Sequence, residues 1–233
     1  MATKELVRSQ AVEDYVKAIF ALEGRSEEPV STTALAARLQ ITAGSVSAML
    51  RKLDDLGMIT HEPYRGVRLT DPGRRLALEI VRHHRLLELF LAEALEMSWD
   101  RVHAEAEVLE HVLSEELEAL IAAKLGHPTL DPHGDPIPSA DLELHEPPTR
   151  SLESLEPGEC GRFVRVSDAD PEMLRYLANL GIAPGDQFAV HSHQPFGGPL
   201  FLRFGERDQT IGGELARAMR VELDAGDSLH AST

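Results

Sequence analysis

The sequence predicts a chain whose N-terminal two-thirds is mainly α-helical, built on a winged helix-turn-helix, and followed by a small all-β barrel. Three observations predict this fold class. Apolar residues recur at helical spacing as far as about residue 125. Two short helices early in the chain are joined by a tight turn. Short β-favouring runs, separated by Gly-rich turns, follow residue 158.

The first element is a helix over residues 10–23, which place their apolar side chains at helical spacing. A shorter helix over Ala34–Leu39 comes next, and the Ile41-Thr42 turn leads into a helix over Ala43–Leu56. Two helices joined by so short a turn form a helix-turn-helix.

The residues on both sides of Tyr64-Arg65-Gly66 favour β structure, which predicts a two-stranded wing. The pattern is helical again from Pro72 to about Ala94, and a second long helix is expected from Trp99 to Leu125. These two amphipathic helices are a candidate dimer interface. Alternatively, they cover the core of the first domain.

Residues 126–158 are rich in Pro, Asp and Gly and have no sustained period, so they are predicted to form a linker. Its histidines, His127, His133 and His145, are expected to be exposed. Beyond the linker, a short helix over Pro171–Leu180 interrupts the strands of the barrel. Strands are expected at Cys160–Val166, Gln187–His191 and Leu200–Phe204.

The net charge of −16 is distributed unevenly. Residues 1–75 carry 11 basic and 10 acidic residues, whereas residues 76–233 carry 12 basic and 29 acidic ones. A surface that binds DNA is therefore expected in the first third of the chain. The sequence has one cysteine, no run of 18 apolar residues and no signal-peptide pattern at its start, so a cytoplasmic protein without a membrane partner is expected.

The most informative residues are histidines and carboxylates at helical spacing. Four of them fall within about 100° of arc on one predicted helix, and these are His103, Glu107, Glu110 and His111. The preceding helix adds His84 and Glu88, and the first helix adds Asp14. The alternative is an exposed polar face, but the apolar neighbours favour a divalent metal site. Neither an HExxH motif nor a nucleophile elbow is present, so nothing in the sequence indicates a catalytic centre.

The order of these elements, together with three motifs, resembles the diphtheria toxin repressor family of metal-dependent regulators. The motifs are His84-Arg85-Leu86, Val102-His103 with Glu110-His111-Val112, and residues 131–138, DPHGDPIP. The resemblance covers nearly the whole chain. Residues 177–186, LANLGIAPGD, are similar to the ferrous-transport-type SH3-like domain of some members. The resemblance thus implies a helical dimerisation domain after the winged helix and an SH3-like barrel at the end.

The resemblance also implies two metal sites. The primary, activating site falls on Asp14, Glu107, Glu110 and His111. The ancillary site falls on His84, Glu88 and His103, completed from the barrel by Asp168 or, as a second candidate, Asp170.

The resemblance bears on the choice of metal as well. The iron-responsive branch has Met and Cys at the positions of Asp14 and Glu107, whereas carboxylates at both are typical of the manganese-responsive branch. Hard oxygen donors suit Mn(II). Small manganese regulators of the family have a second carboxylate one turn after the Asp, where this chain has Lys17. A separate ancillary site is therefore expected instead of a binuclear cluster.

Contacts with DNA are expected from the second helix of the helix-turn-helix and from the wing. The candidate residues are Thr42, Ser45, Ser47, Arg51, Lys52, Tyr64, Arg65 and Arg68. Because strongly directional base readers are absent from this helix, discrimination between sequences is expected to rest partly on DNA shape.

These observations predict a homodimeric, Mn(II)-activated DNA-binding regulator that binds a double-stranded operator. The family resemblance implies that its targets are metal-uptake genes. The expected division is 1–73 for the winged helix, 74–126 for the metal-binding and dimerisation domain, 127–158 for the linker and 159–233 for the SH3-like domain. Three alternatives stay open: an Fe(II)-responsive repressor, a metalloenzyme with a helix-turn-helix interaction module, and a metal-independent winged-helix regulator.

Overall fold

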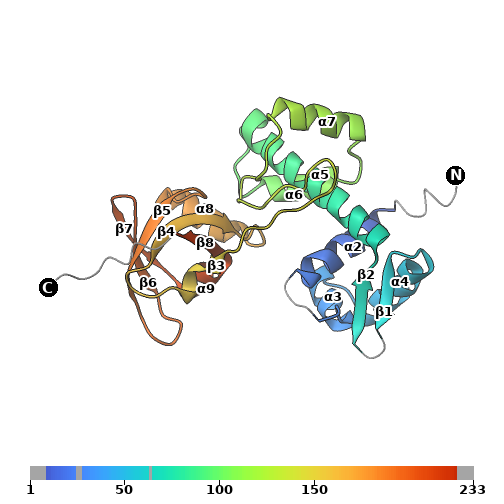
Figure 1. Cartoon of the computed structure of the whole chain (residues 1–233), viewed down its shortest axis with the longest axis horizontal. Helices are drawn as coiled ribbons and strands as arrows, with labels where there is room; N and C mark the ends of the chain where they lie inside the picture. The colour runs from blue at the N-terminus through green and yellow to red at the C-terminus, as the bar shows by residue number, and fades with distance from the viewer. Residues whose placement is uncertain (1–8, 25–27, 63–64, 225–233) are drawn as a thin grey trace.

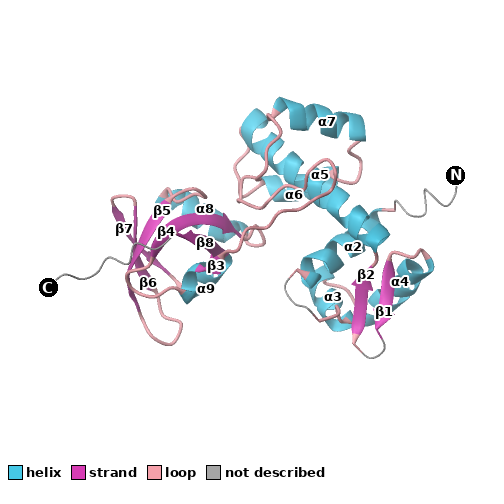
Figure 2. Cartoon of the chain, viewed as in Figure 1, coloured by secondary structure: helices cyan, strands magenta, loops and turns pink. Residues whose placement is uncertain are grey.

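The computed structural model describes residues 9–24, 28–62 and 65–224. Two bodies built mainly from helices are followed by a body built mainly from strands (Figure 1, Figure 2). Each body has its own hydrophobic core. The predicted fold class, a helical N-terminal region followed by an all-β region, is confirmed.

The first body is a helix-turn-helix with a wing. Its elements are α2 (Gln10–Glu23), α3 (Thr32–Leu39), α4 (Ala43–Asp55), β1 (Ile59–Glu62) and β2 (Gly66–Leu69). The turn between α3 and α4 is tight because Gln40 adopts a left-handed conformation, with φ at 54°. Thr42 then caps α4 by accepting a hydrogen bond from the backbone N–H of Ser45. Fully buried side chains from all of these elements form one core; they include Val16, Leu35, Val46, Leu53 and Val67.

The long helix α5 (Asp71–Leu95) connects the first body to the second. Thr70 caps its N-terminus, and Pro72 stands in its first turn, where a missing N–H costs no helical hydrogen bond. The N-terminal part of α5 contributes to the first core, and residues from Leu86 onward contribute to the second. One helix is therefore shared by the cores of the first two bodies.

The expected second long helix, from Trp99 to Leu125, is wrong. The structure has two shorter helices, α6 (Val102–Leu109) and α7 (Glu115–Lys124). The interruption has a local cause, since Ser114 adopts an extended conformation and its side chain accepts a hydrogen bond from the N–H of Leu117. Glu110 and His111 therefore lie in the turn after α6 and not on a continuous helical face.

The segment between α7 and the barrel is mostly irregular, but parts of it are packed against the helices. Ile137 belongs to the second hydrophobic core. His133 is fully buried, so its expected exposure is wrong. Its backbone carbonyl accepts a hydrogen bond from the N–H of Val166, so this part of the segment also contacts the barrel.

The third body is a six-stranded antiparallel sheet with the strand order β3-β8-β4-β5-β6-β7. Its strands are β3 (Arg150–Ser151), β4 (Cys160–Val166), β5 (Gln187–His193), β6 (Leu200–Phe204), β7 (Arg207–Ile211) and β8 (Met219–Leu223). Its helical elements are the 3-10 turn η1 (Leu152–Ser154), α8 (Pro171–Leu180) and α9 (Gly213–Ala218). Its core is apolar throughout, and Trp99 of the helical region packs against it from outside. The barrel is thereby placed next to α5 and α6.

Candidate metal centre

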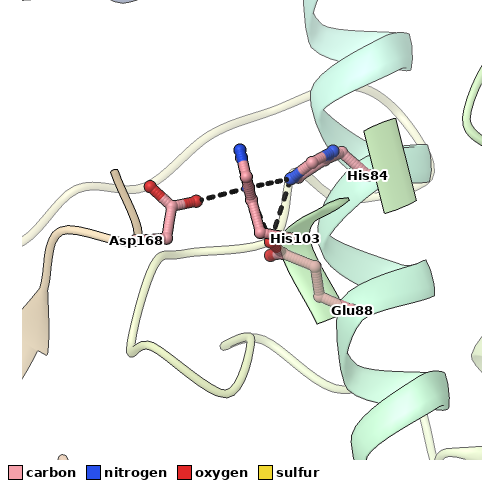
Figure 3. A group of neighbouring side chains, drawn as sticks. All are labelled: His84, Glu88, His103 and Asp168. Carbon is pink, nitrogen blue, oxygen red and sulfur yellow. Dashed lines mark hydrogen bonds and ion pairs between the residues drawn. The ribbon is translucent and has the colours of Figure 1, made fainter. Parts of the chain in front are cut away.

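The ancillary site residues converge from three segments of the chain. His84 and Glu88 lie one turn apart on α5, His103 lies at the start of α6, and Asp168 follows β4 of the barrel. Figure 3 shows these four side chains pointing toward one another. Donor atoms of all four lie within 4.8 Å of one another. Of the two barrel candidates, Asp168 is the one that reaches this group, because the side chain of Asp170 caps α8.

The distances in this group are short enough for the four side chains to share one cation. His103 Nδ1 lies 2.9 Å from Asp168 Oδ2, 3.2 Å from Glu88 Oε1 and 3.1 Å from His84 Nε2. His84 Nε2 also lies 2.9 Å from Glu88 Oε1. A single proton on a ring nitrogen can point at only one of these partners, whereas a metal ion binds all of them at once. The donor set, two imidazoles and two carboxylates, suits a divalent transition metal.

The electrostatics of the ancillary site also favour positive charge. Hydrogen bonds that His103 donates to the carboxylates of Asp168 and Glu88 raise the pKa of His103 to about 10. Burial raises the pKa of Asp168, but the hydrogen bond with His103 and the charges of His103 and His133 together lower it below its usual value. Protonated His103 thus offsets part of the negative charge of Asp168 and Glu88, and a divalent ion that binds here would have to replace that proton.

Two further residues that the sequence did not single out as ligands lie beside the predicted ancillary set. His133 donates from Nε2 to the backbone carbonyl of Trp99 at 2.8 Å, which leaves Nδ1 facing Glu88 Oε2 at 3.7 Å. Both of these facing atoms are buried without a hydrogen-bond partner. Asp131 offers a carboxylate to the same pair. Although burial opposes it, Glu88 raises the pKa of His133 to about 9. The signal for both residues was their place in the DPHGDPIP motif.

The primary site residues come from α2 and from the turn after α6. Asp14, Glu110 and His111 have donor atoms within 4.8 Å of one another. His111 Nε2 lies 3.0 Å from Asp14 Oδ1 and 3.6 Å from Glu110 Oε1. Burial raises the pKa of Asp14 above its usual value. The arrangement joins a helix of the first body directly to the second.

Glu13 orients the imidazole of His111. Its buried carboxylate accepts a hydrogen bond from His111 Nδ1 at 2.7 Å, because an ionised carboxylate can only accept. His111 Nε2 then carries a lone pair, and it is buried without a hydrogen-bond partner. Histidine ligands of metals are commonly held in this way, with the second ring nitrogen donating to a carboxylate. Glu13 was missed by the sequence analysis, where only its neighbour Asp14 stood out.

Glu107 is separated from the rest of the expected primary set. Its donor atom groups with those of His84 and Glu110, not with those of Asp14 and His111. Its side chain is 43% exposed, and Oε1 accepts a hydrogen bond from Lys17 Nζ at 2.7 Å. Burial raises the pKa of Glu107, but Lys17 outweighs this and lowers it below its usual value.

On α4, several of the expected DNA-contacting side chains make local hydrogen bonds. Thr42 caps the helix, and Ser45 Oγ lies 3.0 Å from its hydroxyl. Ser47 Oγ donates to the backbone carbonyl of Ala43. Arg51 is exposed and Lys52 is half-buried. The N-terminal half of α4 is thus uncharged, and its basic residues lie in its C-terminal half.

In the wing, the two arginines form salt bridges with acidic side chains. Arg65 lies 2.6 Å from Glu28 and 3.6 Å from Glu62, and Arg68 donates to Glu62 at 2.7 Å. Tyr64 lies outside the described residues. The wing therefore presents arginines whose charge is partly balanced within the chain.

Large apolar side chains are exposed on α6, on α7 and in the turn between them. They are Val108, Leu109, Val112, Leu117 and Leu120, with Val108 and Val112 exposed to 68% and 77%. Exposed apolar patches of this kind are typical of protein–protein interfaces. Among the described residues, no helix has the length and apolar character needed to cross a bilayer.

Family models match the three bodies of the chain in order. Residues 8–67 match the iron dependent repressor N-terminal DNA binding domain. Residues 70–139 match the iron dependent repressor metal binding and dimerisation domain. Residues 150–223 match the FeoA domain.

Individual relatives match over almost their full length. The iron-dependent repressor IdeR of Mycobacterium tuberculosis is 30% identical over 230 residues, which cover 90% of this chain and 96% of the relative. The diphtheria toxin repressor of Corynebacterium glutamicum is 28% identical over 233 residues, covering 96% and 100%.

Solved structures agree with these matches. A manganese-dependent transcriptional repressor in complex with manganese is 43% identical, with a TM-score of 0.85, and covers 91% of this chain and 99% of its own. The manganese regulator SloR is 29% identical, with a TM-score of 0.74, covering 91% and 98%.

Proposed function

Because the chain belongs to the diphtheria toxin repressor family, and is therefore a metal-dependent DNA-binding repressor and not an enzyme, we propose that Mn(II) is the ion that activates it. The supporting observation is the donor set. Asp14, Glu110 and His111 offer oxygen and imidazole nitrogen, and no sulfur atom is among them. Carboxylate-rich sites suit Mn(II), whereas thiolate and thioether ligands favour softer ions.

The described geometry suits a metal at both sites. At the primary site, the fit rests on the buried, bare Nε2 of His111, which Glu13 holds toward Asp14 and Glu110. At the ancillary site, the fit rests on the number of nitrogen and oxygen atoms that face one another, which is larger than one shared proton can connect by hydrogen bonds. When bound, the ion supplies a divalent charge that several ligands can share. We assign Glu107 to the edge of the primary site, within reach of Lys17.

In this proposal, Asp14 is the ligand that couples metal binding to DNA binding. It lies on α2, whose apolar face is part of the core that also holds the helix-turn-helix. His111 and Glu110 belong to the second body. Drawing these residues together favours one tilt of α2 relative to α5, so a ligand that prefers this arrangement shifts the population toward the DNA-binding form.

The DNA surface that we propose consists of α4 and the wing. Arg51 and Lys52 on α4 and the wing residues Tyr64, Arg65 and Arg68 supply contacts with phosphates. Thr42, Ser45 and Ser47 bring the N-terminal turn of α4 close to the bases, because their hydroxyls are short and already engaged with the helix. Indirect readout of DNA shape then supplies much of the specificity.

We further propose that the repressor acts as a homodimer, and that the exposed apolar residues of α6 and α7 form the interface. The family model that covers these helices describes a metal binding and dimerisation domain. Val112, exposed to 77%, lies directly after the metal ligand His111. Sedimentation of Val112→Glu should give a monomer at concentrations where the unchanged protein is expected to sediment as a dimer.

The test of the proposed function is a gel shift with the promoter region of the protein's own gene. Mn(II), Fe(II) and Zn(II) are titrated separately, with a chelator as the metal-free reference. We expect Mn(II) to produce DNA binding at the lowest free concentration. Preferential response to Fe(II) would instead support the iron-dependent alternative, consistent with the names of the mycobacterial relatives. Binding that no metal changes would overturn the proposal. The same experiment on metal-uptake promoters tests the expected targets.

A further inference from the structure

Glu118 of α7 contacts two consecutive residues of α5 with its two carboxylate oxygens. Its Oε1 accepts a hydrogen bond from Arg82 Nε at 2.6 Å, and its Oε2 lies 3.1 Å from His83 Nε2. The side chains of Arg82, His83 and Glu118 are 10%, 3% and 16% exposed, so these contacts are largely shielded from water. Removing one member of a shielded ion pair leaves the other charge uncompensated, so both α5 residues depend on this carboxylate.

His83 extends this connection to the turn after α6. The ring nitrogen that does not face Glu118, Nδ1, lies 3.2 Å from the backbone carbonyl oxygen of Glu110. A carbonyl oxygen and a carboxylate oxygen can only accept hydrogen bonds, so both ring nitrogens of His83 donate. A ring that donates from both nitrogens is positively charged. The charge of His83 therefore depends on its buried partner Glu118.

The carbonyl of Glu110 is one of the groups that a helix leaves without an internal partner. Glu110 caps the C-terminus of α6, and His111 follows it in the turn. The last carbonyl groups of a helix need donors from elsewhere and carry partial negative charge, which a nearby cation stabilises. His83 meets both needs. It thus fixes the backbone at the point from which the side chains of Glu110 and His111 reach toward Asp14.

The other contact of Glu118 leads in a different direction. Arg82 Nη1 donates to the backbone carbonyl of Pro138 at 2.6 Å, at the end of the DPHGDPIP motif. This contact ties α5 to the segment that precedes the barrel. Of the two contacts of Glu118, the one with His83 is the one that continues to the primary site, so their effects can be separated by substitution.

We propose that Glu118 is a positioning residue for the primary metal site and acts on it through His83. This inference rests on the metal-dependent function proposed above. The carboxylate of Glu118 keeps His83 charged, and His83 holds the carbonyl of Glu110, so the turn with the ligands is in place before an ion arrives. A turn that is already in place loses less conformational freedom on binding, which raises the affinity for the metal.

The experiment compares Glu118→Gln and His83→Gln with Arg82→Gln, using the full-length protein. Glu118→Gln removes the charge and keeps the shape of the side chain. His83→Gln removes the charged ring, whereas Arg82→Gln removes the contact that leads to Pro138. Glu116→Gln removes an exposed carboxylate from the same first turn of α7 and is the matched control.

Two quantities are measured for each protein by gel shift. The first is the Mn(II) concentration at which DNA binding is half-maximal, and the second is the affinity for DNA at saturating Mn(II). Thermal unfolding of the metal-free proteins is recorded as well. The comparison of the first two quantities separates an effect on metal binding from a loss of the DNA-binding fold.

We expect Glu118→Gln and His83→Gln to raise the half-activating Mn(II) concentration about tenfold or more, as is typical for residues that orient metal ligands. Their affinity for DNA at saturating Mn(II) should match that of the unchanged protein, because the bound ion then holds the turn. Arg82→Gln should lower the melting temperature and leave the half-activating concentration as it is. Glu116→Gln should change neither quantity.

A half-activating concentration that stays unchanged in Glu118→Gln or in His83→Gln would overturn the inference. An equal rise in Arg82→Gln would do the same, because the effect would then follow from a general loss of stability. If Glu118→Gln does not fold without metal, His83→Gln decides, since it leaves the contact between Glu118 and Arg82 in place. Failure of the proposed function looks different, because the unchanged protein would then bind DNA equally well with and without Mn(II).

Discussion

His84 is the side chain that connects the two proposed metal sites. Its Nδ1 lies 2.5 Å from Glu110 Oε2, and its Nε2 lies 2.9 Å from Glu88 Oε1. Burial lowers the pKa of His84, but hydrogen bonds with Glu110 and Glu88 outweigh burial and raise it. The protonation of one ring therefore links a ligand of the primary site with a ligand of the ancillary site.

Replacing Glu107 by cysteine should change the preference for metals. A thiolate at this position favours softer ions over Mn(II), so we expect Glu107→Cys to lower the ratio of Mn(II) to Fe(II) response in DNA binding about tenfold or more. Titration of both metals in the gel shift measures the ratio. Glu105→Cys, exposed on the same helix, controls for the presence of a thiol. An unchanged ranking in Glu107→Cys would exclude Glu107 from the ligands.

The metal-free protein should lose stability from His103 as the pH rises. The pKa of His103 is about 10 in the folded chain, against 6.5 for an unperturbed histidine. The folded state therefore holds this proton more tightly. The stabilisation is complete below pH 6.5, declines above it and is lost as the pH passes 10.

Urea unfolding of the metal-free protein tests this sign. His103→Gln should reduce the free energy of unfolding more at pH 6.5 than at pH 9.5. His191→Gln, at an exposed position on β5, is the control and should behave alike at both values. An equal loss at both values in His103→Gln would show that His103 is not a protonated partner of Asp168 and Glu88.

Among the elements, the wing contains a carboxylate, that of Glu62, which competes with DNA phosphates for the wing arginines. Glu62 lies 2.7 Å from Arg68 and 3.6 Å from Arg65, the two residues proposed to contact the DNA backbone. Glu62→Gln should therefore tighten DNA binding several-fold and steepen its salt dependence, because the arginines gain charge available to phosphate. Arg65→Ala should do the opposite and flatten the salt slope by about one unit.

Gel shifts over a range of salt concentrations measure both effects on the wing. Glu116→Gln on α7 removes the same charge from an exposed position outside the proposed surface. If Glu62→Gln matched Glu116→Gln in affinity and slope, the wing arginines would not face phosphate.

The elements that sequence periodicity predicted best are those with local start and stop signals. The helix expected over residues 10–23 has the same bounds in the structure, and α4 differs from its expected range by one residue. The break between α6 and α7 was missed because apolar residues continue through it, while Ser114 redirects the chain with one capping hydrogen bond.

The candidate site was harder to predict where its residues depend on tertiary packing. The helical spacing of His84 with Glu88 brings these two together without help from the rest of the fold. His133 becomes part of the site only because its loop is packed between Trp99 and the barrel. Glu13 becomes a partner of His111 through contact between segments 98 residues apart. No local pattern encodes either contact.

At the scale of the whole molecule, the two metal sites should have separable roles. His111→Ala removes a ligand between α2 and the second body, so we expect it to abolish the metal-dependent gain in DNA affinity. His103→Ala removes a ligand between α6 and the barrel, so DNA binding should stay metal-responsive but weaken, and the barrel should loosen. Metal affinity should fall by more than roughly 100-fold at the site that loses its ligand.

Mn(II) titration by gel shift, together with limited proteolysis between residues 126 and 158, separates these roles. Faster cleavage is expected for His103→Ala and not for His111→Ala, because only the former disconnects the barrel. Full activation of His111→Ala, with loss of activation in His103→Ala, would mean that the two assignments are reversed.

Gly134 makes the chain poorly suited to exchange of its barrel with that of another protein. Its φ is +86°, and a Cβ at this position would lie 1.8 Å from the carbonyl oxygen of Val164 on β4. The neighbouring Trp99 packs on the barrel core from the same side. Deleting or replacing residues 150–223 would thus expose the indole ring of Trp99 to water. It would also expose the loop around Gly134, which packs against β4. A chimaera that keeps these contacts has to carry residues 131–135 and Trp99 together with the barrel.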